Sequence, residues 1–423
     1  IRMVRPSRGN APTAWTVSTL AGNGTTGFAD GSAAGGMFNN PQGIADGPNV
    51  LVYVADTANN RIRRITAART VTTLAGDGTP GLQNGIGNQA RFNAPQGIAV
   101  DSDGNVYVAD TGNSAVRKID AAGNVSTVAG DGSVGSNDSP GARFDGLVGV
   151  AVEGQNIYVY LADSGNHRIR RLDVAGTVIT VTGAERGFKD GSAAQARFAE
   201  PSGIVIDSDG QIVVADAVNS LIRSVDPNLA TSGSSQAVTT LAGTGIRGLT
   251  DGAGNVARFF TPRGLAITNS SAIIVADTGN QVLRRVLLPP IIHTLVPPSG
   301  RAGDTIQIHG ARFDARGPER NAVRFTKSGG GTTFGSVTQA THTVVTVVVP
   351  ADATSGPLTV ETEGGIATAP TDFVVNQFPA PVISDFNPKR GTPGTQVILT
   401  GSNLKVDAND PSVTFAGNNG TRL

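Results

Sequence analysis

The chain is built from an internal repeat. The pattern V-x-T-[LV]-A-G, or a near variant, starts at Val17, Val71, Val125, Val178 and Val238. The pattern A-D-x-x-N recurs with its aspartate at Asp56, Asp110, Asp163, Asp216 and Asp277, so the spacings are 54, 53, 53 and 61 residues. The last spacing is longer because PNLATSGSSQ (227–236) lengthens one connection. A fixed period of this size means that one supersecondary unit is stacked several times.

Each repeat is expected to form four short strands. In the second copy these are GIAVD (97–101), NVYVAD (105–110), AVRKID (115–120) and NVSTVAG (124–130). Alternation of apolar and polar residues, enrichment in β-branched residues and flanking turn residues all favour strands. Pairs such as Asp-Gly and Gly-Asn between them suit tight hairpins.

Four antiparallel strands repeated radially form a β-propeller, so the expected fold class is all-β. The repeat resembles the NHL family, whose motif is close to GNVYVADTGNSAVRKID (104–120) and to ADSGNHRIRRLD (162–173). The resemblance covers roughly residues 16–286 in five copies. It implies an NHL-like propeller with five detectable blades. Because members of that family commonly have six blades, a six-bladed ring stays open as an alternative.

The two ends of the repeat region suggest how the ring closes. The last copy stops after its third strand, QVLRRV (281–286), and TVSTLAG (16–22) is a fourth strand without preceding partners. We therefore expect the N-terminal strand to complete the final blade, which would remove exposed sheet edges.

The pattern changes from Pro289 onward. The stretch PPIIHTLVPPSGRAGDTIQIHGARF (289–313) is echoed by APVISDFNPKRGTPGTQVILTGSNL (380–404). Both resemble the opening of IPT/TIG immunoglobulin-like domains, which are β-sandwiches. The expected domains are an N-terminal extension (1–15), the propeller (16–286), an IPT/TIG-like sandwich (287–376) and a second, incomplete IPT/TIG-like domain (377–423). The linker RVLLPPII (285–292) is expected to be a semi-rigid joint in which Leu287, Leu288 and Ile291 pack.

Composition excludes several classes of function. With 33 basic and 33 acidic residues the formal net charge is zero, which argues against nucleic-acid binding by bulk charge. The absence of cysteine excludes thiol catalysis, disulfides and Cys-ligated metals. No apolar run approaches the roughly 20 residues that span a bilayer. Residues 1–14 (IRMVRPSRGNAPTA) are polar and show no signal peptide.

Three recurrent motifs are better explained by structure than by chemistry. G-x-G-x-x-G occurs at 22–27, 76–81, 130–135 and 243–248, but a polar loop and a strand follow it instead of the helix that a dinucleotide site needs. The repeated aspartate is expected to cap a turn, and arginines such as Arg117 and Arg170 are expected to pair with acids. The Arg-Phe pairs at 91–92, 143–144, 197–198 and 258–259 predict a phenylalanine wedge between blades.

Metal sites are not expected. DSDG at 101–104 and 207–210 lacks the remaining EF-hand ligands and favours a hairpin turn. Only four histidines occur, at His167, His293, His309 and His342, so a His-based zinc site is not supported. We therefore expect no catalytic residue, no metal and no cofactor.

The favoured function is a non-enzymatic binding or scaffolding protein, with a propeller head on an Ig-like stalk, secreted or at a bacterial-type cell surface. The resemblance implies a protein or glycan partner, with self-association through the Ig-like domains as a further option. One alternative is a hydrolase or lactonase-like propeller with a channel metal, although the propeller has only three glutamates, Glu153, Glu185 and Glu200. A second alternative is an RNA-binding NHL propeller, which lacks support from charge and aromatic content.

The long connections between successive repeats are the candidate contact surface. Because strands alternate in direction, these loops share one face with the A-D-x-x-N turns, whereas the chain leaves for the stalk at the other face. Function favours long loops on a rigid scaffold. The predicted binding residues are those that depart from the shared loop pattern: Phe28, Leu82, Arg186, Phe188, Lys189 and Arg247. The competing interpretation is that these loops only brace neighbouring blades.

Overall fold

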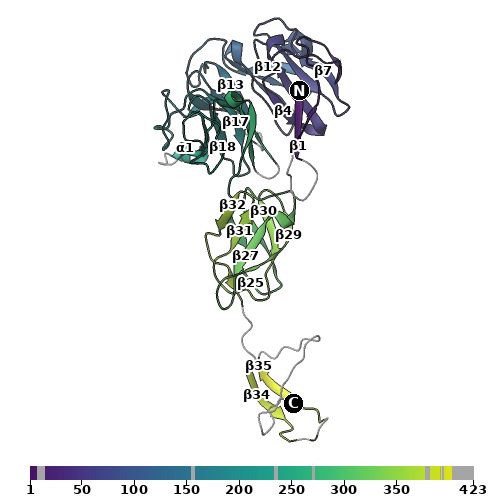
Figure 1. Cartoon of the computed structure of the whole chain (residues 1–423), viewed down its shortest axis with the longest axis vertical. Coiled ribbons are helices and arrows are strands. Elements are labelled where there is room, and N and C mark those ends of the chain that lie inside the picture. The colour runs from purple at the N-terminus through teal and green to yellow at the C-terminus, as the bar shows by residue number, and fades with distance from the viewer. Residues whose placement is uncertain are drawn as a thin grey trace.

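The computed structural model describes residues 1–6, 15–153, 158–232, 237–268, 272–376, 382–390, 392 and 395–402. The protein is all-β in these residues apart from short 3-10 turns and the helix α1 (Pro227–Ser232). The propeller sheets, a two-sheet sandwich and a hairpin follow one another along the long axis of the molecule (Figure 1). The expected fold class is confirmed.

Four blades have the four-stranded antiparallel meander that the repeat predicts. In each, the strands a, b, c and d pair in chain order. Blade 1 consists of β4 (Ile44–Gly47), β5 (Leu51–Asp56), β6 (Arg61–Ile65) and β7 (Thr70–Ala75), and blade 2 of β9 (Ile98–Val100), β10 (Val106–Asp110), β11 (Ala115–Ile119) and β12 (Asn124–Ala129). Blade 3 consists of β13 (Leu147–Val152), β14 (Tyr158–Asp163), β15 (Arg168–Asp173) and β16 (Val178–Thr182). Blade 4 consists of β17 (Pro201–Ile206), β18 (Ile212–Asp216), β19 (Leu221–Val225) and β20 (Val238–Ala242).

The outer edge of strand d is covered by the loop that leads into its own blade. In blades 1 and 2 this loop forms the short strands β3 (Gly31–Ser32) and β8 (Gly85–Ile86), which pair with β7 and β12. In blade 4 a single bridge joins Gly191 to Val238. In blade 3 the contact is a backbone hydrogen bond from the N–H of Ser139 to the carbonyl of Val178, so the loop contacts strand d in all four complete blades.

In the described residues, blade 5 contains three strands, β21 (Pro262–Ile267), β22 (Ile273–Asp277) and β23 (Val282–Val286). The expectation that residues 16–22 supply its fourth strand is wrong. The strand β2 (Trp15–Thr19) instead pairs with β1 (Arg2–Pro6), in a separate two-stranded sheet. Residues that the sequence assigned to an N-terminal extension thus contain a strand.

The β1–β2 hairpin reproduces the c–d half of a blade. Its register pairs Arg2 with Thr19, as Arg63 pairs with Thr73 in blade 1. The reason lies in the first four residues, Ile-Arg-Met-Val, which match the strand-c sequence Ile-Arg-Arg-Ile at 62–65. A partner a few residues away closes a far smaller loop than β23 would, which favours the local pairing. The adjoining Ala21 is fully buried beside blade 1.

The strands a converge on a common axis and touch through glycine. A Cβ on Gly43, Gly97, Gly149 or Gly203 would lie 1.9, 2.1, 2.0 or 2.0 Å from a backbone carbonyl oxygen of the next blade. Only glycine allows backbones to approach this closely. The equivalent Gly264 of blade 5 meets no following blade, and its Cβ would lie 3.4 Å from Ala276 of its own blade. The series of close glycine contacts between neighbouring blades therefore ends at blade 5.

Phenylalanine wedges fill the spaces between blades, as predicted. Phe92, Phe144, Phe198 and Phe259 are all buried. Phe92 packs in one cluster with Ala55 and Ile62 of blade 1 and with Val108 of blade 2. Fully burying such a side chain contributes roughly 1.5–3 kcal/mol, so the wedges are a main source of contact between blades.

The first Ig-like domain is a sandwich of two four-stranded sheets. One sheet has the order β24 (Ile291–Val296), β26 (Thr305–Ala311), β30 (Val344–Val348) and β29 (Ser336–Ala340). The other has the order β28 (Thr332–Phe334), β27 (Ala322–Thr326), β31 (Thr359–Thr362) and β32 (Gly365–Thr368). A short parallel pair adds β25 (Ser299–Gly300) and β33 (Val374–Val375).

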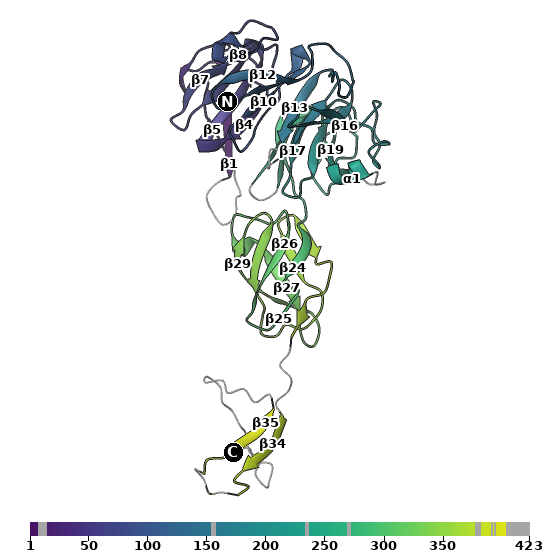
Figure 2. The same cartoon turned by 180° about the vertical axis from the view of Figure 1, so that it is seen from behind.

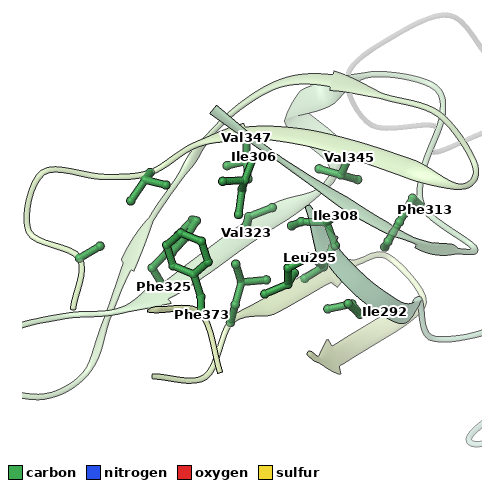
Figure 3. Close-up of a cluster of buried hydrophobic side chains, with 14 residues drawn as sticks. Ile292, Leu295, Ile306, Ile308, Phe313, Val323, Phe325, Val345, Val347 and Phe373 are labelled. Atoms are coloured by element: carbon green, nitrogen blue, oxygen red, sulfur yellow. The ribbon is translucent and has the colours of Figure 1, made fainter. Parts of the chain in front are cut away.

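The sandwich core forms from inward-facing residues of both sheets. Ile308 and Val347 lie opposite Val323 and Phe325, and Phe373 stacks edge-on against Phe325 with ring centroids 5.4 Å apart (Figure 3). The second Ig-like copy is described as one hairpin, β34 (Val382–Asn387) with β35 (Ile398–Ser402). The stretch SVTFAGNNG (412–420) lies outside the described residues.

The sandwich docks on the a–b turn of blade 4. The guanidinium of Arg312 lies 2.9 Å from the carboxylate of Asp207, and both side chains are almost completely buried. Nearby, His293 Nε2 lies 3.0 Å from Asp209. The linker residue Leu288 is buried in the core of blades 4 and 5, as expected, while Leu287 and Ile291 are half-buried. Figures 1 and 2 show the sandwich below one side of the propeller.

Candidate binding face

The b–c turns and the loops between blades lie on one face because hydrogen bonds join them. The Nδ2 atom of the A-D-x-x-N asparagine donates to the carbonyl of the last glycine of the loop pattern. The bonds are Asn59–Gly27, Asn113–Gly81, Asn166–Gly135, Asn219–Gly187 and Asn280–Gly248, all 2.7–2.8 Å. The G-x-G-x-x-G repeats are thus structural in all the loops, as expected from the absence of a following helix.

The repeated aspartate anchors this face from beneath. In every blade its side chain is fully buried, and one oxygen accepts the backbone N–H of the residue after the wedge phenylalanine. The other oxygen faces a strand-c arginine: the pairs are Arg63–Asp56, Arg117–Asp110, Arg170–Asp163, Arg223–Asp216 and Arg284–Asp277, at 2.7, 2.9, 2.7, 2.8 and 3.2 Å. The predicted turn-capping role is wrong in detail: Asp56, Asp110 and Asp277 make no side-chain capping bond to the turn that follows them, and their carboxylates instead hold the wedge segment and strand c.

Each of these arginines also reaches the loop that leads into its blade. Its Nη2 atom donates to Asp30, Asn84, Asp138, Asp190 or Asp251, one in each blade. The guanidinium lies over the wedge ring, for example 5.0 Å from the centroid of Phe92 in the case of Arg117. The planar fork of arginine suits such a bridge, which holds the loop against the blade.

Burial governs the titration of three of the anchoring carboxylates, those of blades 2, 3 and 4. It raises the pKa of Asp110 and Asp163 above the usual value for aspartate, and it raises the pKa of Asp216 to about 6. Hydrogen bonds from the backbone, from asparagine and from arginine oppose the shift without cancelling it.

Four of the five loops place an exposed apolar side chain at the same position of the face. The residue directly after the last glycine of the pattern is Phe28, Leu82, Phe188 or Leu249 in four of the loops, and these are 44%, 39%, 56% and 58% exposed. The fifth loop has Ser136 there. Phe28, Leu82 and Phe188 were predicted. Leu249 was missed because the selection favoured residues that depart from the loop pattern, although alignment of the loops would have found it.

The predicted basic residues lie on the same loops but do not form one cluster. The guanidinium of Arg186 lies 3.7 Å from Glu200 in an exposed pair. The backbone carbonyl of Lys189 accepts a bond from the buried Arg223, so its backbone is braced. Arg247 lies over the ring of Phe260, with 5.4 Å between guanidinium carbon and centroid.

The centre of the propeller presents few ionisable groups. A cavity of ≈ 180 Å³ is lined by the P-x-G segments of four blades, with Gln42, Gln96, Ser202 and Arg263 at the variable position, and by the equivalent Val148 and Gly149 of blade 3. Among the described residues no group of three His, Cys, Asp or Glu side chains lies close enough to hold a metal ion. Of the three glutamates, Glu185 pairs with Arg197 and Glu200 with Arg186 on the loop face.

The DSDG segments are hairpin turns, as predicted. Asp101 accepts bonds from the backbone of Asp103 and Asn105, and Asp207 does the same for Asp209 and Gln211. No helix in the described part of the chain is long and apolar enough to cross a membrane.

Comparison with known families identifies both modules. The NHL repeat model matches residues 92–119 and 198–223, and the IPT/TIG domain model matches 290–375 and 381–422. The chain contains NHL repeats and IPT/TIG domains. Each matched NHL segment begins at a wedge phenylalanine, Phe92 or Phe198, and extends through the anchoring Asp–Arg pair of its blade, which is blade 2 or blade 4.

Relatives match part of the chain. The chain is 32% identical over 287 residues to the protein SUPPRESSOR OF QUENCHING 1, chloroplastic, of Arabidopsis thaliana, covering 63% of this chain and 27% of that protein. It is 32% identical over 204 residues to NHL repeat-containing protein 2 of Bos taurus, covering 41% and 28%. The chain thus spans little more than a quarter of either relative. An auxiliary nutrient binding protein from Bacteroides thetaiotaomicron aligns with 18% identity and a TM-score of 0.41, over 63% of this chain and 75% of that one.

Proposed function

We propose that this protein is a non-enzymatic binding or scaffolding protein whose NHL propeller presents its loop face to a protein or glycan. The observation that carries this proposal is the position of the stalk. The IPT/TIG sandwich docks on an a–b turn, through Arg312 and Asp207, whereas the b–c turns and the loops between blades lie on the opposite face. The loop face therefore stays free while the propeller is held at the end of the stalk.

The composition of the loop face suits recognition. Exposed apolar side chains repeat around it at Phe28, Leu82, Phe188 and Leu249, and solvent-exposed apolar residues that cluster on a rigid face favour an interaction site. Arginine and aromatic residues are enriched where binding energy concentrates in interfaces. The pair Arg61–Phe28, with the guanidinium 3.9 Å from the ring centroid, offers both in one contact.

The test uses fluorescently labelled protein on a glycan array and on an array of immobilised extracellular proteins. The variant Arg186→Ala/Lys189→Ala/Arg247→Ala removes three exposed cations and no buried contact, so it should fold normally and lose at least tenfold in affinity for any hit. The matched control is Val174→Ser, an 83% exposed residue in a c–d turn on the other face. Binding that survives the triple change but is lost in the control would overturn the choice of face.

A secreted or cell-surface location is part of the same proposal, because a propeller head on Ig-like domains suits display at a distance from an anchor. Self-association through the Ig-like domains is also proposed. Exposed Phe334 and Ile366 give the sandwich an apolar surface for it. Sedimentation velocity across a hundredfold range of protein concentration would reveal a dimer, and Ile366→Lys should abolish it.

A further inference from the structure

The outer edge of β23 is the one place in the described blades 1–5 where a strand c lacks its strand d. In the four complete blades, the apolar residue at the second position of strand c is Ile62, Val116, Ile169 or Ile222, and each is completely buried. The equivalent Leu283 is 55% exposed. The strand is therefore folded and in register with β22 while its other side is open.

The opposite wall of this opening is already in place. In blade 4, Gly191 and Val238 exchange two backbone hydrogen bonds of 3.0 and 2.9 Å across the outer edge of strand d. Gly31, Gly85 and Gly191 reach this position with a φ of 130°, 153° and 130°, and Gly252 has a φ of 148° at the equivalent point before blade 5. The backbone of Gly252 thus has the conformation in which the other three glycines pair with a strand d, but blade 5 has no strand d among the described residues to pair with it.

Between the two walls lies a groove of ≈ 570 Å³. It is lined by Gly252, Phe259 and residues 283–287 from the propeller, and by Glu363 and Gly364 of the sandwich. The carboxylate of Glu363 pairs with Arg285 at 2.6 Å, so the β31–β32 turn closes one end. The space is a slot between two backbones.

A polar contact in the slot specifies one side chain. In three of the complete blades the loop acid or amide accepts a hydrogen bond from a threonine hydroxyl of strand d as well as from the strand-c arginine. The pairs are Thr73 with Asp30, Thr127 with Asn84 and Thr180 with Asp138; in blade 4, Asp190 instead accepts the backbone N–H of Thr240. Asp251 makes the arginine contact, to Arg284, but its side chain is 92% exposed, compared with 45%, 43% and 39% for Asp30, Asp138 and Asp190.

We propose that the slot between β23 and Gly252 is a strand-acceptor site for an extended peptide segment of the pattern V-x-T-[LV]-A-G, supplied from outside residues 1–423. The incoming strand runs antiparallel to β23. By analogy with β6–β7, its valine lies opposite Val286, its threonine opposite Arg284 and its alanine opposite Leu283. The threonine bonds Asp251. Recognition of this kind is strand addition, in which backbone bonds give affinity and side-chain pockets give specificity.

The occupant comes from outside because each of the five V-x-T-[LV]-A-G copies, all of which lie in the described residues, is already engaged. Four copies form β7, β12, β16 and β20, which pair with the strands c of their own blades. The fifth copy, Val17–Gly22, belongs to β2 and the residues after it, where β2 pairs with β1 and Ala21 is buried against blade 1. Using any of them in β23 would break an existing sheet.

The probe is a synthetic, fluorescently labelled peptide TVTTLAG, the sequence of residues 70–76, titrated into the full chain and followed by fluorescence anisotropy. We expect saturable binding with one peptide per chain. N-methylation of backbone amides in the peptide should abolish binding, because a strand needs them. Replacing the second of the two adjacent threonines, Thr73, by valine in the peptide should weaken binding about tenfold. Asp251→Ala should weaken the parent peptide to a similar extent and remove its preference over the valine peptide.

The matched control separates this site from the loop face. The variant Arg186→Ala/Lys189→Ala/Arg247→Ala should bind the peptide normally, and Asp251→Ala should keep any loop-face ligand. Absence of saturable peptide binding, or binding that tolerates N-methylation, would overturn the proposal. Amide exchange as slow in β23 as in β19 without peptide would show a strand of the chain already in the slot. A dimer that Asp251→Ala dissociates would show a second copy there. Either result would also overturn it.

Discussion

Arg223 and Asp216 are both completely buried, and their charged groups lie 2.8 Å apart at the boundary between blade 4 and the loop that leads into it. The arginine also donates to Asp190 at 2.5 Å and to the carbonyl oxygens of Lys189 and Arg197. One guanidinium therefore connects a strand, a turn and a loop. The same arrangement occurs in each blade, and it explains why the motif keeps an aspartate and an arginine seven residues apart.

Replacing this arginine should unfold blade 4 preferentially. Arg223→Met leaves the Asp216 charge buried without its partner, a change that typically costs about 3–5 kcal/mol. The matched variant Arg284→Met in blade 5 should cost less, because Asp251 is exposed to water and the pair there is longer. Urea denaturation followed by circular dichroism measures both. Equal losses in the two variants would contradict a burial-dependent role.

The raised pKa of Asp216 predicts a pH-dependent contribution to stability. A folded pKa of about 6 exceeds the ordinary aspartate pKa of 3.8, so the native state binds the proton more tightly than the unfolded chain does. The contribution of Asp216 is therefore most favourable below about pH 4 and is lost as pH rises toward 6. The stability difference between the wild type and Asp216→Asn should shrink over this range in urea titrations at several pH values. A difference that is constant from pH 4 to pH 7 would argue against the shift.

The glycines at the centre of the propeller predict a sharp contrast between blades. Gly203→Ala would place a Cβ 2.0 Å from the carbonyl oxygen of Arg263 and should destabilise by about 2–3 kcal/mol through overpacking. Gly264→Ala meets only Ala276, at 3.4 Å, and should change stability by less than about 1 kcal/mol. Thermal melts of the two variants measure the difference in stability loss between them. A large loss for Gly264→Ala would mean that another backbone contacts blade 5 in solution.

The joint between propeller and sandwich should depend on Arg312. Arg312→Ala removes the buried ion pair with Asp207. The hydrogen bond from the backbone N–H of residue 312 to the Ser208 hydroxyl remains. We expect small-angle scattering to show a wider distribution of end-to-end distances, without loss of either domain's fold. Arg320→Ala, which removes only an exposed 3.8 Å contact to Glu319, is the control. Identical scattering curves for Arg312→Ala and the wild type would show that the remaining contacts, among them buried Leu288 and the Arg285–Glu363 pair, fix the joint.

The repeat predicted most of the propeller because it marks the same positions several times. Five aspartates and four Arg-Phe pairs located the turns and the wedges before any contact was known. The extent of arginine burial was harder to predict, because arginine is usually exposed and only the neighbouring loop, brought close by the fold, covers Arg117 or Arg170. Likewise, the loops were placed on one face correctly, but Leu249 was missed as a surface residue.

The N-terminal strand shows where pattern matching failed. Val17 to Gly22 carries the strand-d signature, so its proper partner is a strand c, and β23 was the evident candidate. Ile1 to Val4 also matches a strand c, but these four residues alone carry little of the motif that identifies such strands elsewhere in the chain. Because β1 is close to β2 in the sequence, β2 pairs with it and not with β23. A search for complete repeats does not take this closeness into account.

The bond from each turn asparagine to a loop glycine has a consequence for how the surface can change. It fixes the backbone immediately before the exposed residue and uses none of that residue's own atoms. Phenylalanine, leucine and serine already occupy this position in different loops of one molecule. The scaffold therefore behaves like a display library with one independently variable site per loop, in which new specificities can be assembled by substitution at the tips without refolding the blades.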